Sequence, residues 1–182
     1  MIIVGIDPGS RNCGYSVIND SGVAVKIIEM GTWPLEKLGG KDLGDRLAKL
    51  MELSKELFKK HNPRFIGLEK AVAFKNVVSA FKLSEARGVI RAAAHTVLES
   101  AAERIIEISP TEVKRSASGM GLGSKGSIEK ALRLRFPNSE VFVEGAKLNA
   151  DAFDALAVAW SAKLKSRISS LKEVPSGINT RT

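Results

Sequence analysis

Four acidic residues in this sequence have neighbours that would let their carboxylates act together. Asp7 and Glu69 each end a short apolar run, and Asp151 and Asp154 lie three residues apart in an alanine-rich stretch. The spacing of three places the two aspartates on one face of a helix. A carboxylate at the end of a buried strand costs several kcal/mol to keep ionised unless a cation meets it. A bound cation is therefore the first hypothesis for these acids.

The two aspartates have a simpler interpretation as first-turn acids that the helix dipole stabilises. The hypothesis of a shared site depends on all four acids together. Ligands of open sheets gather at the carboxyl ends of the strands, so neighbouring strands ending at Asp7 and Glu69, with the helix beside them, would form one pocket. Mutual repulsion forbids four carboxylates there without cations. Hard oxygen ligands, with no cluster of cysteine or histidine, favour Mg²⁺ or Mn²⁺ over Zn²⁺.

Hydrophobic periodicity predicts the elements that must position these acids. Alternating β-branched residues predict an antiparallel meander of about three strands, followed by helices of period 3.6 and two parallel-type strands. Strands are expected at 1–6, 15–18, 23–28 with 31–33, 64–69 and 104–108, and helices at 41–60, 76–99, 127–135 and 149–165. A capping box, Ser109 to Glu112, starts a further helix. The fold class is α/β, a mixed sheet covered by helices.

Composition and charge bound the class of protein. The 182 residues suit one domain, expected at 1–165 with a basic, flexible tail at 166–182. The 28 Lys and Arg against 20 Asp and Glu give a net charge of +8, which favours a polyanionic partner. Cys13 is the only cysteine, which excludes an internal disulfide and indicates a reducing compartment, the cytoplasm. The six-residue apolar start is too short for a signal peptide or a membrane span.

Five motifs in order resemble the RuvC family, the bacterial Holliday-junction resolvases. They match in spacing over roughly residues 2 to 163, and any one of them alone is weak. The motifs are Gly5-Ile6-Asp7-Pro8-Gly9-Ser10 with Gly14-Tyr15, Glu69 after its strand, residues 79–88 (SAFKLSEARG), Pro110-Thr111-Glu112-Val113-Lys114, and residues 151–157 (DAFDALA).

The resemblance implies a ribonuclease H-like fold with a mixed five-stranded sheet, a homodimer, and Mg²⁺-dependent nicking of four-way DNA junctions. By position Asp7, Glu69, Asp151 and Asp154 match the family's catalytic, metal-binding acids. Two ions about 3.5 to 4 Å apart would activate the attacking water and stabilise the leaving oxygen. The products would carry 5′-phosphate and 3′-hydroxyl ends. The family also implies the RuvA–RuvB branch-migration complex as a partner.

Basic residues supply the expected contacts with DNA. By position Lys114 and Lys125 match family lysines near the DNA backbone and the active site. Lys125 could stabilise charge in the transition state, and Lys114 could hold a phosphate. Val72 stands where the family commonly has an aromatic residue that stacks on a junction base, so Phe74 either substitutes for it or is a buried phenylalanine. The expected DNA contacts are Phe74, Lys75, Lys82, Lys114, Arg115 and Lys125.

Two other functions compete with cleavage of junctions. Sugar kinases and actin-like ATPases share the fold and begin with a similar Gly-Ile-Asp-x-Gly turn, but they need two such domains. The glycine-rich stretch 119–126 also lacks the spacing of a nucleotide-binding loop. A junction-binding protein that does not cut would need only the basic surface. Four carboxylates argue against it, because without metal ions they would repel the DNA.

Overall fold

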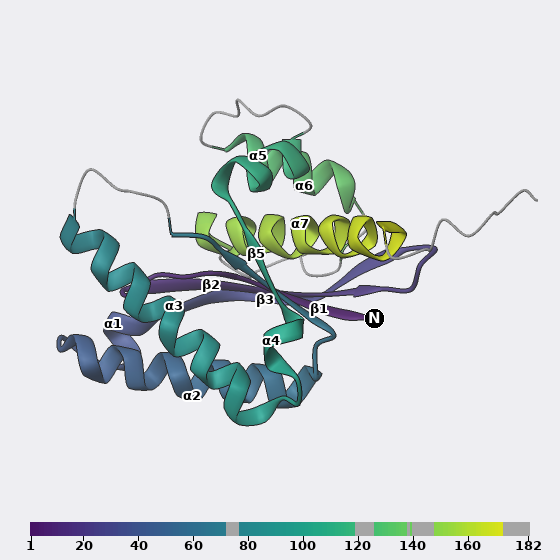
Figure 1. Ribbon diagram of the computed structural model, residues 1–182. Helices are drawn as coiled ribbons and strands as arrows, with labels where there is room; N and C mark the ends of the chain where they lie inside the picture. The colour runs from purple at the N-terminus through teal and green to yellow at the C-terminus, as the bar shows by residue number, and fades with distance from the viewer. Residues whose placement is uncertain (72–76, 119–125, 138, 140–147, 173–182) are drawn as a thin grey trace, which may run out of the picture.

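The computed structural model describes residues 1–71, 77–118, 126–137, 139 and 148–172 of the chain (Figure 1). Side chains beyond residue 168 are not described. The strands are β1 (Ile2–Asp7), β2 (Asn12–Asp20), β3 (Val25–Pro34), β4 (Phe65–Glu69) and β5 (Ile105–Ile108). The helices are α1 (Leu35–Leu38), α2 (Leu43–His61), α3 (Val77–Val97), α4 (Ala101–Arg104), α5 (Pro110–Ser118), α6 (Ser127–Arg135) and α7 (Ala150–Lys172).

The five strands form one mixed sheet in the order β3-β2-β1-β4-β5. β1, β2 and β3 are antiparallel neighbours, whereas β4 pairs parallel with β1 and β5 parallel with β4. The predicted mixed sheet is thus confirmed. The meander strands are longer than predicted, and residues 31–33 continue β3 because they pair with β2 along its whole length. Parallel pairing of β1 with β4 brings the ends at Asp7 and Glu69 to one edge of the sheet.

Helices cover both faces of the sheet, as Figure 1 shows. α7, with α5 and α6 above it, packs on one face, where its Phe153 and Leu156 share a buried core with Ile3 of β1. α2 and α3 pack on the other face, where Leu50, Phe58 and other apolar side chains form a second buried core. Each face therefore removes a full layer of apolar side chains from water, which is the main driving force for this arrangement. None of the helices in the described ranges is long and apolar enough to cross a membrane.

α7 lies unusually close to the sheet because glycine faces it. A Cβ on Gly5 would stand 2.2 Å from the carbonyl oxygen of Ala155, and one on Gly14 would stand 2.0 Å from that of Asp151. The Ser16 hydroxyl donates to the Ala155 carbonyl at 2.9 Å on the same face. Any larger residue at these two glycines would push the helix away from β1 and β2. The glycines therefore determine where the α7 carboxylates lie.

The start of α5 is capped as the sequence predicts. The backbone N–H of Ser109 donates to the Glu112 carboxylate at 2.7 Å, and the N–H of Glu112 donates to the Ser109 hydroxyl at 3.3 Å. This reciprocal pair satisfies two backbone donors of the first turn. Lys165 of α7 also donates to Glu112 at 3.0 Å, which ties α5 to α7.

The predicted boundary at residue 166 is wrong for the segment that directly follows it. α7 continues through residues 166–172, because Ser166 is buried and Arg167 pairs with Asp20 at 3.0 Å. Asp20 is nearly fully buried, and its hydrogen bonds to the Gly22 N–H and to Arg167 hold the pKa of its carboxyl below the usual value although burial opposes them. Residues 173–182 of the expected tail lie outside the described part of the chain.

Candidate active site

Asp7 and Glu69 meet at the edge of the sheet where β1 and β4 end. The register pairs Ile6 with Leu68, so the two acids occupy the next step of the same parallel ladder. Their side chains share a hydrogen bond. The backbone N–H of Lys70 donates to the Ile108 carbonyl at 2.8 Å, which anchors the end of β4 against β5. The two strand-end acids are therefore held together by backbone pairing on both sides.

α7 brings Asp151 and Asp154 to the same edge. β1 pairs Asp7 with Gly14, and the Asp151 carbonyl lies directly over Gly14. Asn149 caps this helix, since its side-chain oxygen accepts from the Ala152 N–H at 3.3 Å. The Asn149 amide also donates to the Asp151 carboxylate at 3.3 Å and so orients it. Three elements thus place all four acids at one edge of the sheet.

The charges of these acids act strongly on one another. Burial, followed by the charges of Glu69 and Asp154, raises the pKa of Asp7 from 3.8 to about 9. Burial also raises the pKa of Glu69 and of Asp154, and the Asp151 charge adds to the effect on Asp154. In the absence of a cation, burial and the neighbouring charges therefore favour a proton retained by the Asp7–Glu69 pair. A proton here neutralises charge that a metal ion would otherwise neutralise.

The donor set suits a hard divalent cation. Carboxylate oxygen atoms are the ligands preferred by Mg²⁺, and this edge of the sheet collects four carboxyl groups, of which burial makes Asp7, Glu69 and Asp154 harder to ionise. Within the described ranges, no three acidic, histidine or cysteine side chains already stand together as a closed metal-ligand group. The residues therefore fit a hard divalent cation by the chemistry of their side chains.

The comparisons with known proteins identify the family. The family model described as crossover junction endodeoxyribonuclease RuvC matches residues 3–161. The chain belongs to the RuvC family.

Its relatives share about a third of their residues with it. The RuvC of Agrobacterium fabrum is 34% identical over 157 residues, covering 86% of this chain and 85% of the relative. The RuvC of Petrotoga mobilis is 34% identical over 160 residues, covering 88% and 91%.

Solved structures share the fold of this RuvC-family chain. Thermus thermophilus RuvC in complex with Holliday junction substrate aligns with a TM-score of 0.77 at 19% identity, covering 93% of this chain and 97% of that one. The yeast mitochondrial Holliday junction resolvase aligns with a TM-score of 0.61 at 20% identity, covering 93% and 82%. The sheet and its helices are those of the ribonuclease H-like class that the sequence predicts.

The residues expected to contact DNA lie on α5, on α3, or outside the described part of the chain. Lys114, an exposed residue of α5, lies close enough to lower the pKa of both Glu69 and Asp154, so it belongs with the acid cluster. Arg115 is the next residue of α5 and is exposed. Lys82 is exposed on α3 and lines a pocket beside the turn that follows Asp7. Phe74, Lys75 and Lys125, like Val72, lie outside the described residues.

Sequence reasoning missed two residues that act on the acids, Arg87 through its charge and Asn149 through hydrogen bonds. Arg87 of α3 donates to Glu107 at 2.5 Å, and its charge lowers the pKa of Glu69. The sequence shows Arg87 only as part of the family motif, because its partner lies on β5. Asn149 could have been recognised as a helix cap, since asparagine two residues before an acid at a helix start is a local signal.

Proposed function

We propose that this chain is a metal-dependent endonuclease that cuts four-way DNA junctions in recombination and repair. The observation that carries the proposal is the convergence of four acids at one sheet edge in a member of the crossover junction endodeoxyribonuclease family. A positively charged chain suits DNA, and the surplus of eight charges gives it long-range attraction for a polyanion. Access to the chromosome makes the cytoplasm the proposed compartment.

Asp7, Glu69, Asp151 and Asp154 would hold the metal, which we propose to be two Mg²⁺ ions, with Mn²⁺ as a substitute. Bound Mg²⁺ would activate a water molecule and stabilise the leaving oxygen of the scissile phosphate. Binding of the metal ions would release the proton shared by Glu69 and Asp7, because the positive charge of the ions would replace it. Lys114, beside Glu69 and Asp154, would attract the phosphate to the pocket. The proposed products carry 5′-phosphate and 3′-hydroxyl ends.

Incubation of a labelled four-way junction and a matched duplex with Mg²⁺ tests the proposal. We expect paired symmetric nicks in the junction alone. Asp7→Asn should bind the junction and cut it at least about a hundredfold more slowly, because even indirect supports of a metal site cost 10- to 100-fold when lost. Glu56→Gln removes an exposed acid of α2 and serves as the matched control. Undiminished cleavage by Asp7→Asn would refute the mechanism, and binding without cleavage by the wild type would indicate a non-cutting junction protein.

The proposed nuclease acts as a homodimer, because two opposing strands must be cut and each chain supplies one acid pocket. We propose α3 as the contact, since its outward face carries small residues such as Gly88 and Ala92. By family resemblance the expected assembly on DNA includes the RuvA–RuvB branch-migration complex.

Light scattering tests the contact through α3. Ala92→Arg places a long charged side chain on the outward face of α3 and should yield monomers that nick only one strand per binding event. Ala48→Arg makes the same change at an exposed position of α2 and should leave the dimer intact. A dimer that persists in Ala92→Arg would place the contact elsewhere.

A further inference from the structure

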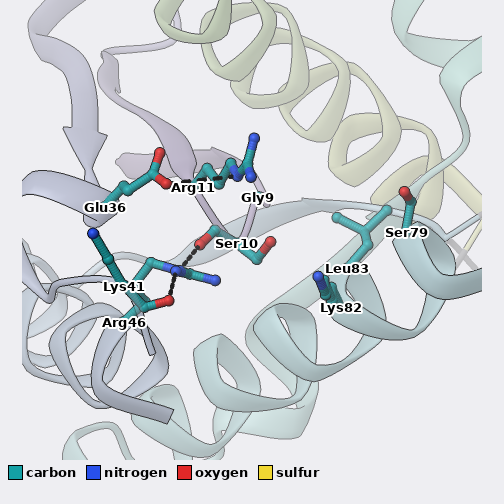
Figure 2. A pocket seen from close by; sticks show the side chains of 9 residues that line it. All are labelled: Gly9, Ser10, Arg11, Glu36, Lys41, Arg46, Ser79, Lys82 and Leu83. Carbon is teal, nitrogen blue, oxygen red and sulfur yellow. Dashed lines mark hydrogen bonds and ion pairs between the residues drawn. The ribbon is translucent and has the colours of Figure 1, made fainter. Parts of the chain in front are cut away.

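A basic pocket of about 620 Å³ lies beside the turn that follows Asp7 (Figure 2). The turn contributes Ser10 and Arg11 to the lining. Lys41 comes from the segment just before α2, Arg46 from the first turns of α2, and Lys82 from α3. The pocket therefore lies on the α2 and α3 side of β1, whereas α7 brings its carboxylates from the opposite face. The residues of the turn directly follow Asp7 in the chain, but none of the four acids lines the pocket.

Arg46 is the buried centre of this pocket. Its side chain belongs to α2 and is only 6% exposed. Nε donates to the Ser10 carbonyl at 2.8 Å, and Nη1 donates to the Lys41 carbonyl at 2.5 Å and to the Gly40 carbonyl at 3.4 Å. Figure 2 shows the remaining nitrogen of the guanidinium pointing into the pocket, towards the side where Lys82 lies.

The charge of Arg46 has no carboxylate partner among the described residues. All three acceptors named above are neutral carbonyl groups, and a buried cation with neutral partners alone retains a demand for an anion. The pocket lining carries four basic side chains against one acid, Glu36, which stands 3.9 Å from Arg11 in an exposed pair. An ion pair as exposed as this one is weak, so Glu36 offsets little of the positive charge in the pocket. The pocket thus presents a surplus of positive charge around a guanidinium held in place.

We propose that this pocket binds a backbone phosphate of the DNA strand that enters the active site, with Arg46 and Lys82 as its ligands. The proposal rests on the proposed function and specifies how the substrate is held. The planar guanidinium fork matches phosphate oxygens, and Lys82 adds a point charge from the facing helix. Arg46 is also a positioning residue, because it holds the carbonyl of Ser10, three residues after Asp7. Phosphate binding is thereby coupled to the position of the catalytic turn.

The salt dependence of junction binding tests the pocket directly. Binding of a fluorescent four-way junction is measured by anisotropy over a range of salt in Asp7→Asn protein without metal, so that no cleavage occurs. Each phosphate contact contributes about 0.9 to the slope of log K against log salt. We expect Arg46→Gln and Lys82→Gln each to reduce the slope by about this amount. Arg64→Gln, at the other end of β4 and exposed, is the matched control and should leave the slope unchanged.

Arg46→Lys separates charge from positioning. Lysine keeps the positive charge but not the fork that holds the Ser10 carbonyl, so the slope should stay near the wild-type value while the nicking rate of Asp7-intact protein falls. A thermal melt of each variant identifies loss of fold, and the exposed Lys82 provides the test if Arg46 variants unfold. Equal nicking by Arg46→Lys and wild type would overturn the positioning role.

The outcomes distinguish this proposal from the proposed nuclease. Unchanged slopes in both Arg46→Gln and Lys82→Gln, in a protein that still cuts junctions, would overturn the pocket alone. Slopes that depend on Arg46 in a protein that never cuts would support the pocket and overturn the nuclease. Inorganic phosphate serves as the other probe. If it raises the Tm of wild type but not of Arg46→Gln, with DNA slopes unchanged, the pocket belongs to free phosphate and the backbone assignment is wrong.

Discussion

Replacing Asp7 with asparagine should stabilise the protein when metal is absent. In the folded protein burial and the neighbouring charges of Glu69 and Asp154 raise the pKa of Asp7 to about 9, against 3.8 ordinarily. Between these pH values the folded chain binds a proton that the unfolded chain has released. The free energy of unfolding therefore falls as the pH rises from about 4 to about 9. Asparagine has no charge to suppress, so the variant escapes this loss.

The size of the effect follows from the raised pKa. The interval from 3.8 to pH 7, at about 1.36 kcal/mol per pH unit, corresponds to about 4 kcal/mol for a lone group. Glu69 is coupled to Asp7, and the cost of burying its own carboxylate remains in the variant. The substitution therefore removes only a part of this electrostatic cost. We expect a gain of about 2 kcal/mol at pH 7, which raises the Tm of a domain of this size by about 4 to 8 °C.

Thermal and urea unfolding in EDTA at pH 5 and pH 8 provide the assay. The advantage of Asp7→Asn should be larger at pH 8, and Glu56→Gln should follow the wild type at both values. Saturating Mg²⁺ should then stabilise the wild type through binding to the folded state and leave the variant unchanged. A variant no more stable than wild type at pH 8 in EDTA would refute the electrostatic reasoning. It would also remove the main argument for a cation at the sheet edge.

Two further predictions concern the supports of the site. Gly14→Ala would place a Cβ 2.0 Å from the Asp151 carbonyl oxygen, so it should destabilise the fold by about 1 to 3 kcal/mol and slow nicking; a melt and a cleavage assay would show this, and a stable, fully active variant would contradict it. Hydrogen bonds from Ser109 lower the pKa of Glu112 to about 2, so its stabilisation is present above about pH 4.5 and is lost as the pH falls towards 2. Glu112→Gln should therefore cost about 1 kcal/mol at pH 7 and nothing near pH 2 in urea melts, with exposed Glu103→Gln as control; an equal cost at both pH values would rule out the charge as the cause.

Local patterns in the sequence predicted most of the elements. The apolar runs ending in Asp7 and Glu69 are strands that end at those residues, and the capping box at Ser109 forms with both of its hydrogen bonds. The positions of four acids at strand ends and on one helix face indicated which acids to consider together, and the family motifs agreed with that choice. These features depend on contacts between residues near one another in the chain, which is why sequence alone suffices.

Tertiary structure decided the features that join distant segments. Only the register of β1 with β4 shows that Asp7 and Glu69 lie side by side, and only the close approach of α7 explains Gly14. The length of α7 was underestimated, because Arg167 finds its partner on β2, 147 residues earlier in the chain.

Arg46 illustrates the same difference. In sequence it is one charged residue of an amphipathic helix, where a solvent-exposed position would be expected. In the folded chain it is buried against the turn after β1 and faces a pocket. Residue type and spacing determined the acids and the helices, because these follow from local periodicity. Burial and partners depend on which surfaces pack together, and that was decided by the sheet and the two layers of helices that cover it.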